Sequence, residues 1–279
     1  CFEDKWILSK LNAVIRDVTD NMDKYELGIA VQKVYDFLWD ELCDWYIEMA
    51  KVRLWKADED PKAANDALWT LRTALTEGLK LLHPYMPFIT EEIYCTLLPE
   101  EESIMISDWP VYQEAWVFPE AEKAVESFKE AIRGIRNTRT EMNVPMNRKT
   151  HLYVVGKDAE TCARYEACKK SFVNLAFAKE IHVQENKNGI GEDAVSVVVS
   201  DAVVYMPLED LVDREKEMER LKKEQERLTK EIARCQGMLN NPNFVNKAPE
   251  AKVNAEKEKL QKYEEMMEKV NVQLKQMEK

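Results

Sequence analysis

Residues 211–239 read LVDREKEMERLKKEQERLTKEIARCQGML, and this stretch decides the class of fold at the C-terminal end of the chain. With Leu211 at heptad position a, mostly apolar residues recur at positions a and d, and a second such series follows over residues 253–277. The Asn- and Pro-rich residues 240–249 between the two series interrupt any continuous helix. The pattern therefore predicts an antiparallel coiled-coil hairpin over residues 211–279.

A row of basic residues follows the first heptad helix at alternating spacings of four and three. Its members are Lys216, Arg220, Lys223, Arg227, Lys230 and Arg234. This spacing keeps the six side chains on one outer arc of the helix, facing away from the heptad seam, and acidic residues occupy neighbouring positions. Two interpretations stay open: a cationic track for a polyphosphate chain, or a solvated face with local Glu–Lys pairs.

Residues 1–145 carry apolar residues at the period of α-helices. Helices are predicted at about residues 2–19, 26–55, 61–82, 87–98 and 119–142. Asp60 followed by Pro61 supplies the N-cap and first-turn residue of the third helix. The sequence His83-Pro84 is expected to end that helix, because a proline disfavours the helical conformation of the residue before it. These segments predict an antiparallel helical bundle over residues 1–145.

The apolar period changes after Pro145. Short β-branched runs are predicted as strands near residues 151–155, 181–184, 194–199 and 203–205, and a helix near residues 159–176 separates the first two. We therefore expect a small α/β connecting module over residues 146–210, without a motif that indicates chemistry. The fold class is mainly α, with a bundle, this module and the C-terminal hairpin.

The net charge of −12 is distributed unevenly along the chain. Residues 1–127 carry a net charge of −14 and residues 156–210 carry −4, whereas residues 128–155 carry +4 and residues 211–279 carry +2. Any binding of nucleic acid must therefore use local basic patches. The second candidate patch lies on the fifth predicted helix, and its members are Lys129, Arg133, Arg136 and Arg139. Pairing of these cations with the many carboxylates of the bundle is the open alternative.

Composition excludes several classes of site. Six cysteines show no CxxC pair and three histidines are widely separated, so we expect no metal site and free thiols in a reducing cytoplasm. Seven glycines disfavour a Gly-rich phosphate loop, and no apolar run reaches the ~20 residues of a membrane span. The chain begins with a cysteine, from which we expect a piece of a longer protein.

Several segments together resemble a known family. KWILSKLN at residues 5–12, CDWYIE at 43–48 and LHPYMPFITEEIY at 82–94 are similar to the anticodon-binding helical domain of class Ia aminoacyl-tRNA synthetases. IMISDWP at residues 104–110 and IRNTRTEMNVP at 135–145 narrow the resemblance to the valyl branch. NFVNKAP, at residues 243–249 within the heptad hairpin, resembles the C-terminal arm of bacterial valyl-tRNA synthetases.

The resemblance implies a tRNA-binding fragment of an ATP-dependent amino acid–tRNA ligase. In the family, the bundle recognises the valine anticodon and the arm packs against the tRNA elbow, where Phe244 and Lys247 at the hairpin tip could touch stacked bases. The HIGH and KMSKS signatures of the ATP-binding catalytic domain are absent from this sequence. We therefore expect no catalytic residue, no metal and no bound cofactor here, with valine tRNA as the partner and a monomeric state.

Three other interpretations remain. The hairpin could be a structural coiled-coil module that docks a protein partner or dimerises, without any binding of RNA. The chain could be an enzyme in its own right, although it shows no nucleophile–base pairing signature. The bundle alone would also suit an isoleucyl or leucyl enzyme, but the C-terminal hairpin argues for the valyl branch.

Overall fold

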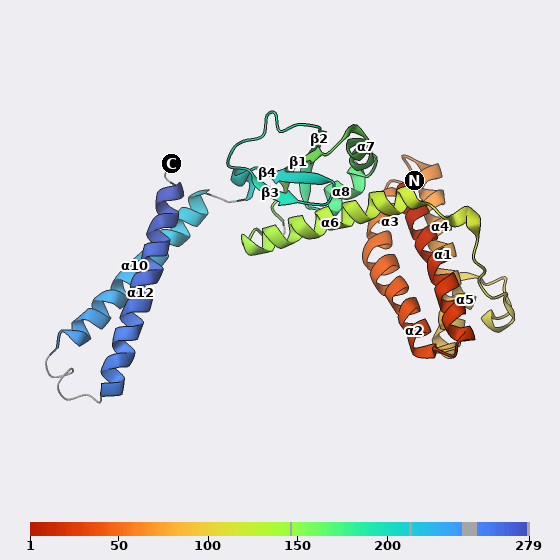
Figure 1. Cartoon of the computed structure of the whole chain (residues 1–279), viewed down its shortest axis with the longest axis horizontal. Helices are drawn as coiled ribbons and strands as arrows, with labels where there is room; N and C mark the ends of the chain where they lie inside the picture. Colours follow the sequence, from red (N-terminus) through yellow and green to blue (C-terminus); the bar gives the residue numbers. More distant parts are fainter. Residues whose placement is uncertain (146, 212–213, 242–249, 278–279) are drawn as a thin grey trace. The chain divides into compact units, whose positions relative to one another are not determined.

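The computed structural model describes residues 1–145, 147–211, 214–241 and 250–277 (Figure 1). The chain forms two compact units, Cys1–Pro207 and Leu208–Lys279. The bundle and the α/β module, which the sequence separates at residue 145, therefore belong to one unit. The second unit begins three residues before the expected boundary at residue 211.

The bundle comprises α1 (Phe2–Asp23), α2 (Leu27–Asp36), a π-helix (Phe37–Tyr46), α3 (Ile47–Leu54), α4 (Pro61–Leu82), α5 (Pro87–Leu97) and α6 (Pro119–Glu141). Two single-turn 3₁₀ helices, Ile104–Ile106 and Glu114–Trp116, lie between α5 and α6. At the start of α4, the Asp60 carboxylate accepts a hydrogen bond from the Ala63 backbone N–H, and Pro61 occupies the first turn as predicted. The helix expected at residues 26–55 runs without a break from Leu27 to Leu54, but its middle part, Phe37–Tyr46, is a π-helix.

α1 lies at the centre of the bundle and packs against α2, α4, α6 and the π-helix. Trp6, Leu11 and Val18 on α1 are completely buried. One polar network enters this core: the Arg53 guanidinium donates to both carboxylate oxygens of Asp4, at 2.6 and 2.7 Å, and the Tyr46 hydroxyl donates to Oδ1 at 2.7 Å. Burial opposes ionisation of Asp4, but these hydrogen bonds outweigh it and lower the pKa of the carboxyl.

The α/β module is a four-stranded sheet of strand order β2-β1-β4-β3. Its strands are β1 (Thr150–Gly156), β2 (Ala178–Gln184), β3 (Val195–Val198) and β4 (Ala202–Met206). β1 and β2 are parallel and are connected through α7 (Ala159–Ala167) and α8 (Lys169–Leu175), whereas β4 is antiparallel to β1 and β3. The single helix expected at residues 159–176 is thus divided at Cys168.

α6 joins the bundle to the sheet (Figure 1). It packs against α1 and also against β3, α7 and α8. Phe128 on α6 meets Phe172 on α8 edge to face, with ring centroids 5.3 Å apart. Gly134 permits a close approach to β3, because a Cβ at that position would clash with Cγ1 of Val197. One helix therefore contributes to both hydrophobic cores.

Lys129 on α6 is buried inside the bundle, with 2% of its surface exposed. Its ammonium donates to Oε2 of Glu41 on the π-helix at 2.6 Å and lies 3.4 Å from Oε1 of Glu126. The rings of Trp6 and Trp45 flank it, with centroids 4.9 and 5.5 Å from Nζ. Two carboxylates and two aromatic faces thus compensate for the loss of hydration of this cation.

The C-terminal unit contains α9 (Leu208–Leu211), α10 (Arg214–Leu239) and α12 (Glu250–Met277). Leu221 and Leu228 of α10 are buried against Val270 of α12, with Tyr263, Met266 and Met267 packed around them. Gln225 donates to Asn271 at 2.6 Å, and the Cys235 thiol donates to Glu256 at 3.2 Å. The early part of α10 therefore meets the late part of α12, and the predicted antiparallel pairing along the heptad seam is confirmed.

The environment of Lys129 gives a stability prediction. We expect Glu41→Gln to lower the free energy of unfolding by on the order of 3 kcal/mol, because it leaves a buried ammonium without its closest carboxylate. Lys129→Met should cost less, because the Glu41 side chain is 24% exposed and can be hydrated. Urea unfolding followed by tryptophan fluorescence tests this, since all seven tryptophans precede residue 117. Lys51→Met, which removes an exposed ion pair with Glu48, is the control and should change stability by less than about 0.5 kcal/mol. Equal losses for the two core variants would contradict the assignment.

Candidate nucleic-acid interface

The basic row on α10 is partly described by the structure. Lys223, Arg227, Lys230 and Arg234 are exposed, in agreement with the arc expected from their spacing. Lys216 and Arg220 lie on the early part of α10, where the side chains fall outside the described part of the chain. Phe244 and Lys247 lie outside the described residues altogether. The structure therefore shows exposed cations on α10 from residue 223 to residue 234.

Two of these arginines pair with carboxylates of their own helix. Arg227 donates to both oxygens of Glu224, at 2.6 and 2.8 Å, and Arg234 lies 2.9 Å from Glu231. The hydrogen bonds from Arg227 to Glu224 raise the pKa of its guanidinium. Both arginine side chains nevertheless keep more than half of their surface exposed, 53% and 56%. Ion pairs that are exposed to solvent in this way contribute little to stability, so a phosphate can compete with the carboxylate for the guanidinium.

The four cations expected on α6 do not form one surface. Lys129 is buried against Glu41, as described above, and does not present its charge to a solvent-borne polyanion. Arg139 is also buried, with 4% of its surface exposed. Pairing with a carboxylate of the bundle, the alternative left open for this helix, is what Lys129 does. Arg139 instead donates its hydrogen bonds to backbone carbonyls.

Arg139 organises the segment between α6 and β1. Its Nη2 donates to the carbonyl oxygens of Pro145 at 3.1 Å and of Arg148 at 2.6 Å, and the guanidinium lies over the Phe177 ring. Burial lowers the pKa of Arg139, yet a guanidinium stays protonated at neutral pH. Arg139 therefore acts by holding in place a segment that carries the exposed Lys149.

Arg133 and Arg136 are exposed on α6. The guanidinium of Arg133 lies 5.2 Å from the centroid of the Trp45 ring, and Nε of Arg136 donates to the Leu175 carbonyl at 3.1 Å. Partial burial lowers the pKa of Arg136. In both side chains the remaining N–H groups are available to an external acceptor, which makes this pair the cationic surface of α6.

Two aromatic rings that the sequence did not single out are the most exposed large hydrophobic side chains of the bundle. Tyr25, between α1 and α2, is 88% exposed, and Phe88, in the first turn of α5, is 91% exposed. The Tyr85 hydroxyl donates to the Leu27 carbonyl at 3.1 Å, which ties these two turns together. Tyr25 also has a positive φ of 60°, which is unusual for a residue other than glycine. Helical periodicity gives no signal for Tyr25, which lies in a turn, and singles out no ring in the first turn of a helix, where Phe88 lies.

Within the described ranges, none of the helices combines the length and apolarity needed to cross a bilayer.

Comparison with known proteins links this geometry to two families. A family model described as the anticodon-binding domain of tRNA ligase matches residues 4–154. A second, described as the valyl tRNA synthetase tRNA binding arm, matches residues 213–278. The first match covers the helical bundle and most of β1, and the second covers α10 and α12.

Curated relatives are similar along nearly the whole chain. The valine–tRNA ligase of Clostridium perfringens is 49% identical over 274 residues, which is 96% of this chain. That of Clostridium tetani is 51% identical over 267 residues, and that of Staphylococcus carnosus is 39% identical over 274 residues. The chain spans 30% of the length of the two clostridial relatives and 31% of the staphylococcal one. The first family model covers more than half of the chain, and the chain therefore belongs to the family of anticodon-binding domains of tRNA ligases.

Proposed function

We propose that this chain is the tRNA-binding part of a valine–tRNA ligase, in which the bundle recognises the anticodon and the α10–α12 arm contacts the tRNA elbow. The observation that carries the proposal is the succession of the two family matches along one chain, with exposed cations on both matched regions. The alternative of a coiled-coil protein-interaction module finds no support in these matches.

The arm would bind the tRNA backbone without reading its sequence. A row of exposed Lys and Arg side chains on a helix can neutralise successive phosphates and release their counterions, and this contribution depends on charge rather than on base identity. The seam of α10 is occupied by α12, which supports action as a monomer.

The bundle would hold the anticodon loop, whose unpaired bases are accessible to side chains. Arg133 and Arg136 would contact its phosphates or bases, and Arg139 would position the following segment. ATP-dependent joining of valine to tRNA belongs, in this proposal, to parts of the ligase other than this chain. The six free thiols support a reducing, cytoplasmic setting.

The arm provides the first test. Replacing Arg220, Lys223, Arg227 and Lys230 by serine should weaken binding of valine tRNA and reduce the log–log slope of affinity against salt by at most about 3–4 units. Filter binding at several salt concentrations measures both. The matched control replaces four exposed lysines of α12 by serine, which removes the same charge: Lys252, Lys257, Lys262 and Lys269. An unchanged slope in the α10 variant, or an equal change in the control, would remove the α10 face from the interface.

The bundle provides a second test. We expect Arg133→Ser combined with Arg136→Ser to weaken binding of an isolated valine anticodon stem-loop and to lower its salt slope by at most about 2 units, because two cations are lost. A stem-loop with an exchanged anticodon shows whether these arginines read bases. If they contact only phosphates, the double substitution should weaken the binding of both stem-loops equally. The control, Lys56→Ser with Lys62→Ser, removes two exposed charges elsewhere on the bundle. If the control and the test variant behave alike, the contact surface of the bundle does not include α6, and the turns that carry Tyr25 and Phe88 become the next candidates.

A further inference from the structure

The two faces of the four-stranded sheet differ. One face is buried: Leu152 and Val154 of β1 and Val204 and Met206 of β4 are inaccessible, and Val197 of β3 lies against Gly134 of α6. The residues between them point to the opposite face and are only partly covered. α6, α7 and α8 supply the cover of the buried face. The proposed function assigns tRNA contacts to the bundle and to the α10–α12 arm, and it gives no role to this outer face of the sheet.

Three rings form a row across this outer face. Tyr153 on β1 is opposite His182 on β2 and opposite Tyr205 on β4 in the strand registers. The Tyr153 and His182 rings stack, with centroids 5.0 Å apart and planes inclined by 24°. Three adjacent strands thus carry three planar side chains in one row. Tyr153 and His182 cover part of each other's faces, so a nucleobase would stack on the remaining ring surface at the outside of the row.

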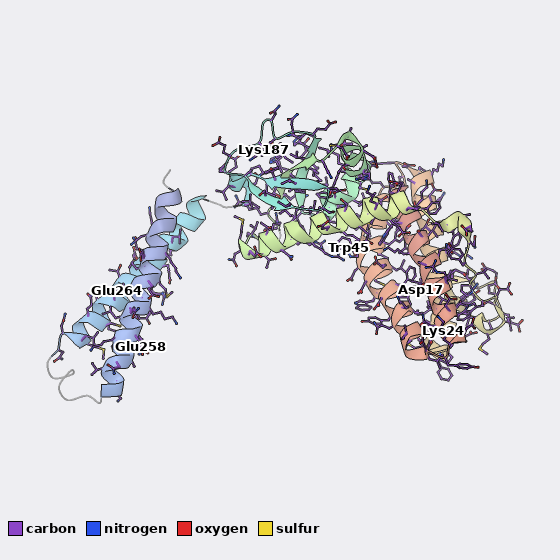
Figure 2. All side chains as sticks on the ribbon, viewed as in Figure 1. Asp17, Lys24, Trp45, Lys187, Glu258 and Glu264 are labelled. Carbon is purple, nitrogen blue, oxygen red and sulfur yellow. The ribbon has the colours of Figure 1, made fainter. Side chains whose placement is uncertain are left out.

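One cation lies against this row of rings, and two more are exposed where β1 and β2 begin. The Lys187 ammonium, on the loop between β2 and β3 (Figure 2), is 5.0 Å from the centroid of the Tyr205 ring. Lys149 directly precedes β1 and Lys179 lies at the start of β2, and both are exposed. Glu180, which lies 3.8 Å from His182, is the acidic neighbour on β2. Positive charge around planar rings suits a chain of bases linked by phosphates.

The face also carries polar groups among its rings. Ser196 is opposite Tyr205, His151 begins the outer residues of β1, and the tyrosines bring their hydroxyls. The valines of the next row, Val155, Val203 and Val198, share this face. The core of a surface that docks a polypeptide is depleted of charged residues, whereas the Lys187 ammonium lies against the Tyr205 ring here. Rings with interspersed hydrogen-bonding groups match the faces and edges of nucleobases better.

We infer that the outer face of this sheet stacks unpaired nucleotides of the bound tRNA, through Tyr153, His182 and Tyr205. The inference rests on the proposed binding of tRNA and adds a third contact region to it. The rings supply affinity without reading sequence, because every base has a face that stacks, and Lys187, Lys149 and Lys179 attract the connecting phosphates.

The test uses the whole chain and a short, unstructured oligouridylate as the probe. Tyr153→Val and Tyr205→Val, each compatible with a strand, should weaken oligouridylate binding at least about fivefold per ring, the loss expected for one stacked base. Tyr153→Phe and Tyr205→Phe keep the ring and should retain the affinity. Val198→Ser, on the exposed part of the same face, is the matched control and should bind normally. Thermal unfolding of each variant verifies the fold.

Photocrosslinking of the oligouridylate, followed by peptide mapping, gives the location independently. Adducts on Tyr153, His182 or Tyr205 are expected, and adducts confined to the bundle or the arm would overturn the inference. Equal affinities of the valine and phenylalanine variants would also overturn it.

Failure of this inference is distinguishable from failure of the proposed function. Loss of a stacking ring removes no charge, so it should leave the salt slope of tRNA binding unchanged, whereas the α10 serine variant should lower it. A chain that binds valine tRNA with the expected salt dependence but shows no effect of the ring variants keeps the proposed function and loses the sheet contact. A chain that binds no tRNA loses the proposed function as well.

Discussion

The N-terminal unit depends on the buried ammonium of Lys129. An isolated cation in a protein core is unfavourable by many kcal/mol, so the helix that carries it must bring the ammonium to compensating groups on other elements. Three of the compensating groups, Trp6, Glu41 and Trp45, lie on α1 and on the π-helix, and Glu126 of α6 itself is the fourth. The requirement fixes both the rotation and the axial position of α6 against the bundle. Since α6 continues to the sheet, where Phe128 meets Phe172, the same restraint sets the place of the α/β module.

The sequence predicts the arm better than it predicts the bundle surface. A heptad series specifies which residues are buried and needs only a neighbouring helix of the same period, so Leu221, Leu228 and Val270 are found at the seam as expected. The exposure of the basic residues is harder to predict. Spacing gives the angular position of a side chain on its helix, but not which other elements cover that side. α6 is covered from two sides, which spacing alone does not reveal.

A local signal could have separated the cations of α6. Lys129 has Val125 four residues before it and Ile132 three residues after it, and both are completely buried. Arg139 likewise follows the buried Ile135 by four residues. A cation within the apolar stripe of an amphipathic helix is a candidate for internal compensation rather than for ligand binding. The backbone hydrogen bonds of Arg139 could not have been inferred in this way, because they depend on where the carbonyl groups of Pro145 and Arg148 lie.

The same types of side chain serve two purposes in this chain, and the difference between them is desolvation. In the bundle, Lys129 has lost its water and relies on Glu41, so an external phosphate could recruit it only by disrupting the core. On α10, Arg227 keeps its hydration and its pairing with Glu224 is weak, so the guanidinium can exchange one anion for another. A count of basic residues therefore overestimates the size of a polyanion-binding surface. Exposed ion pairs within one helix, in contrast, do not argue against polyanion binding. The informative quantity is the exposed fraction of each cation, which an amino-acid sequence supplies only where the periodicity of its helix and all of its neighbours are known.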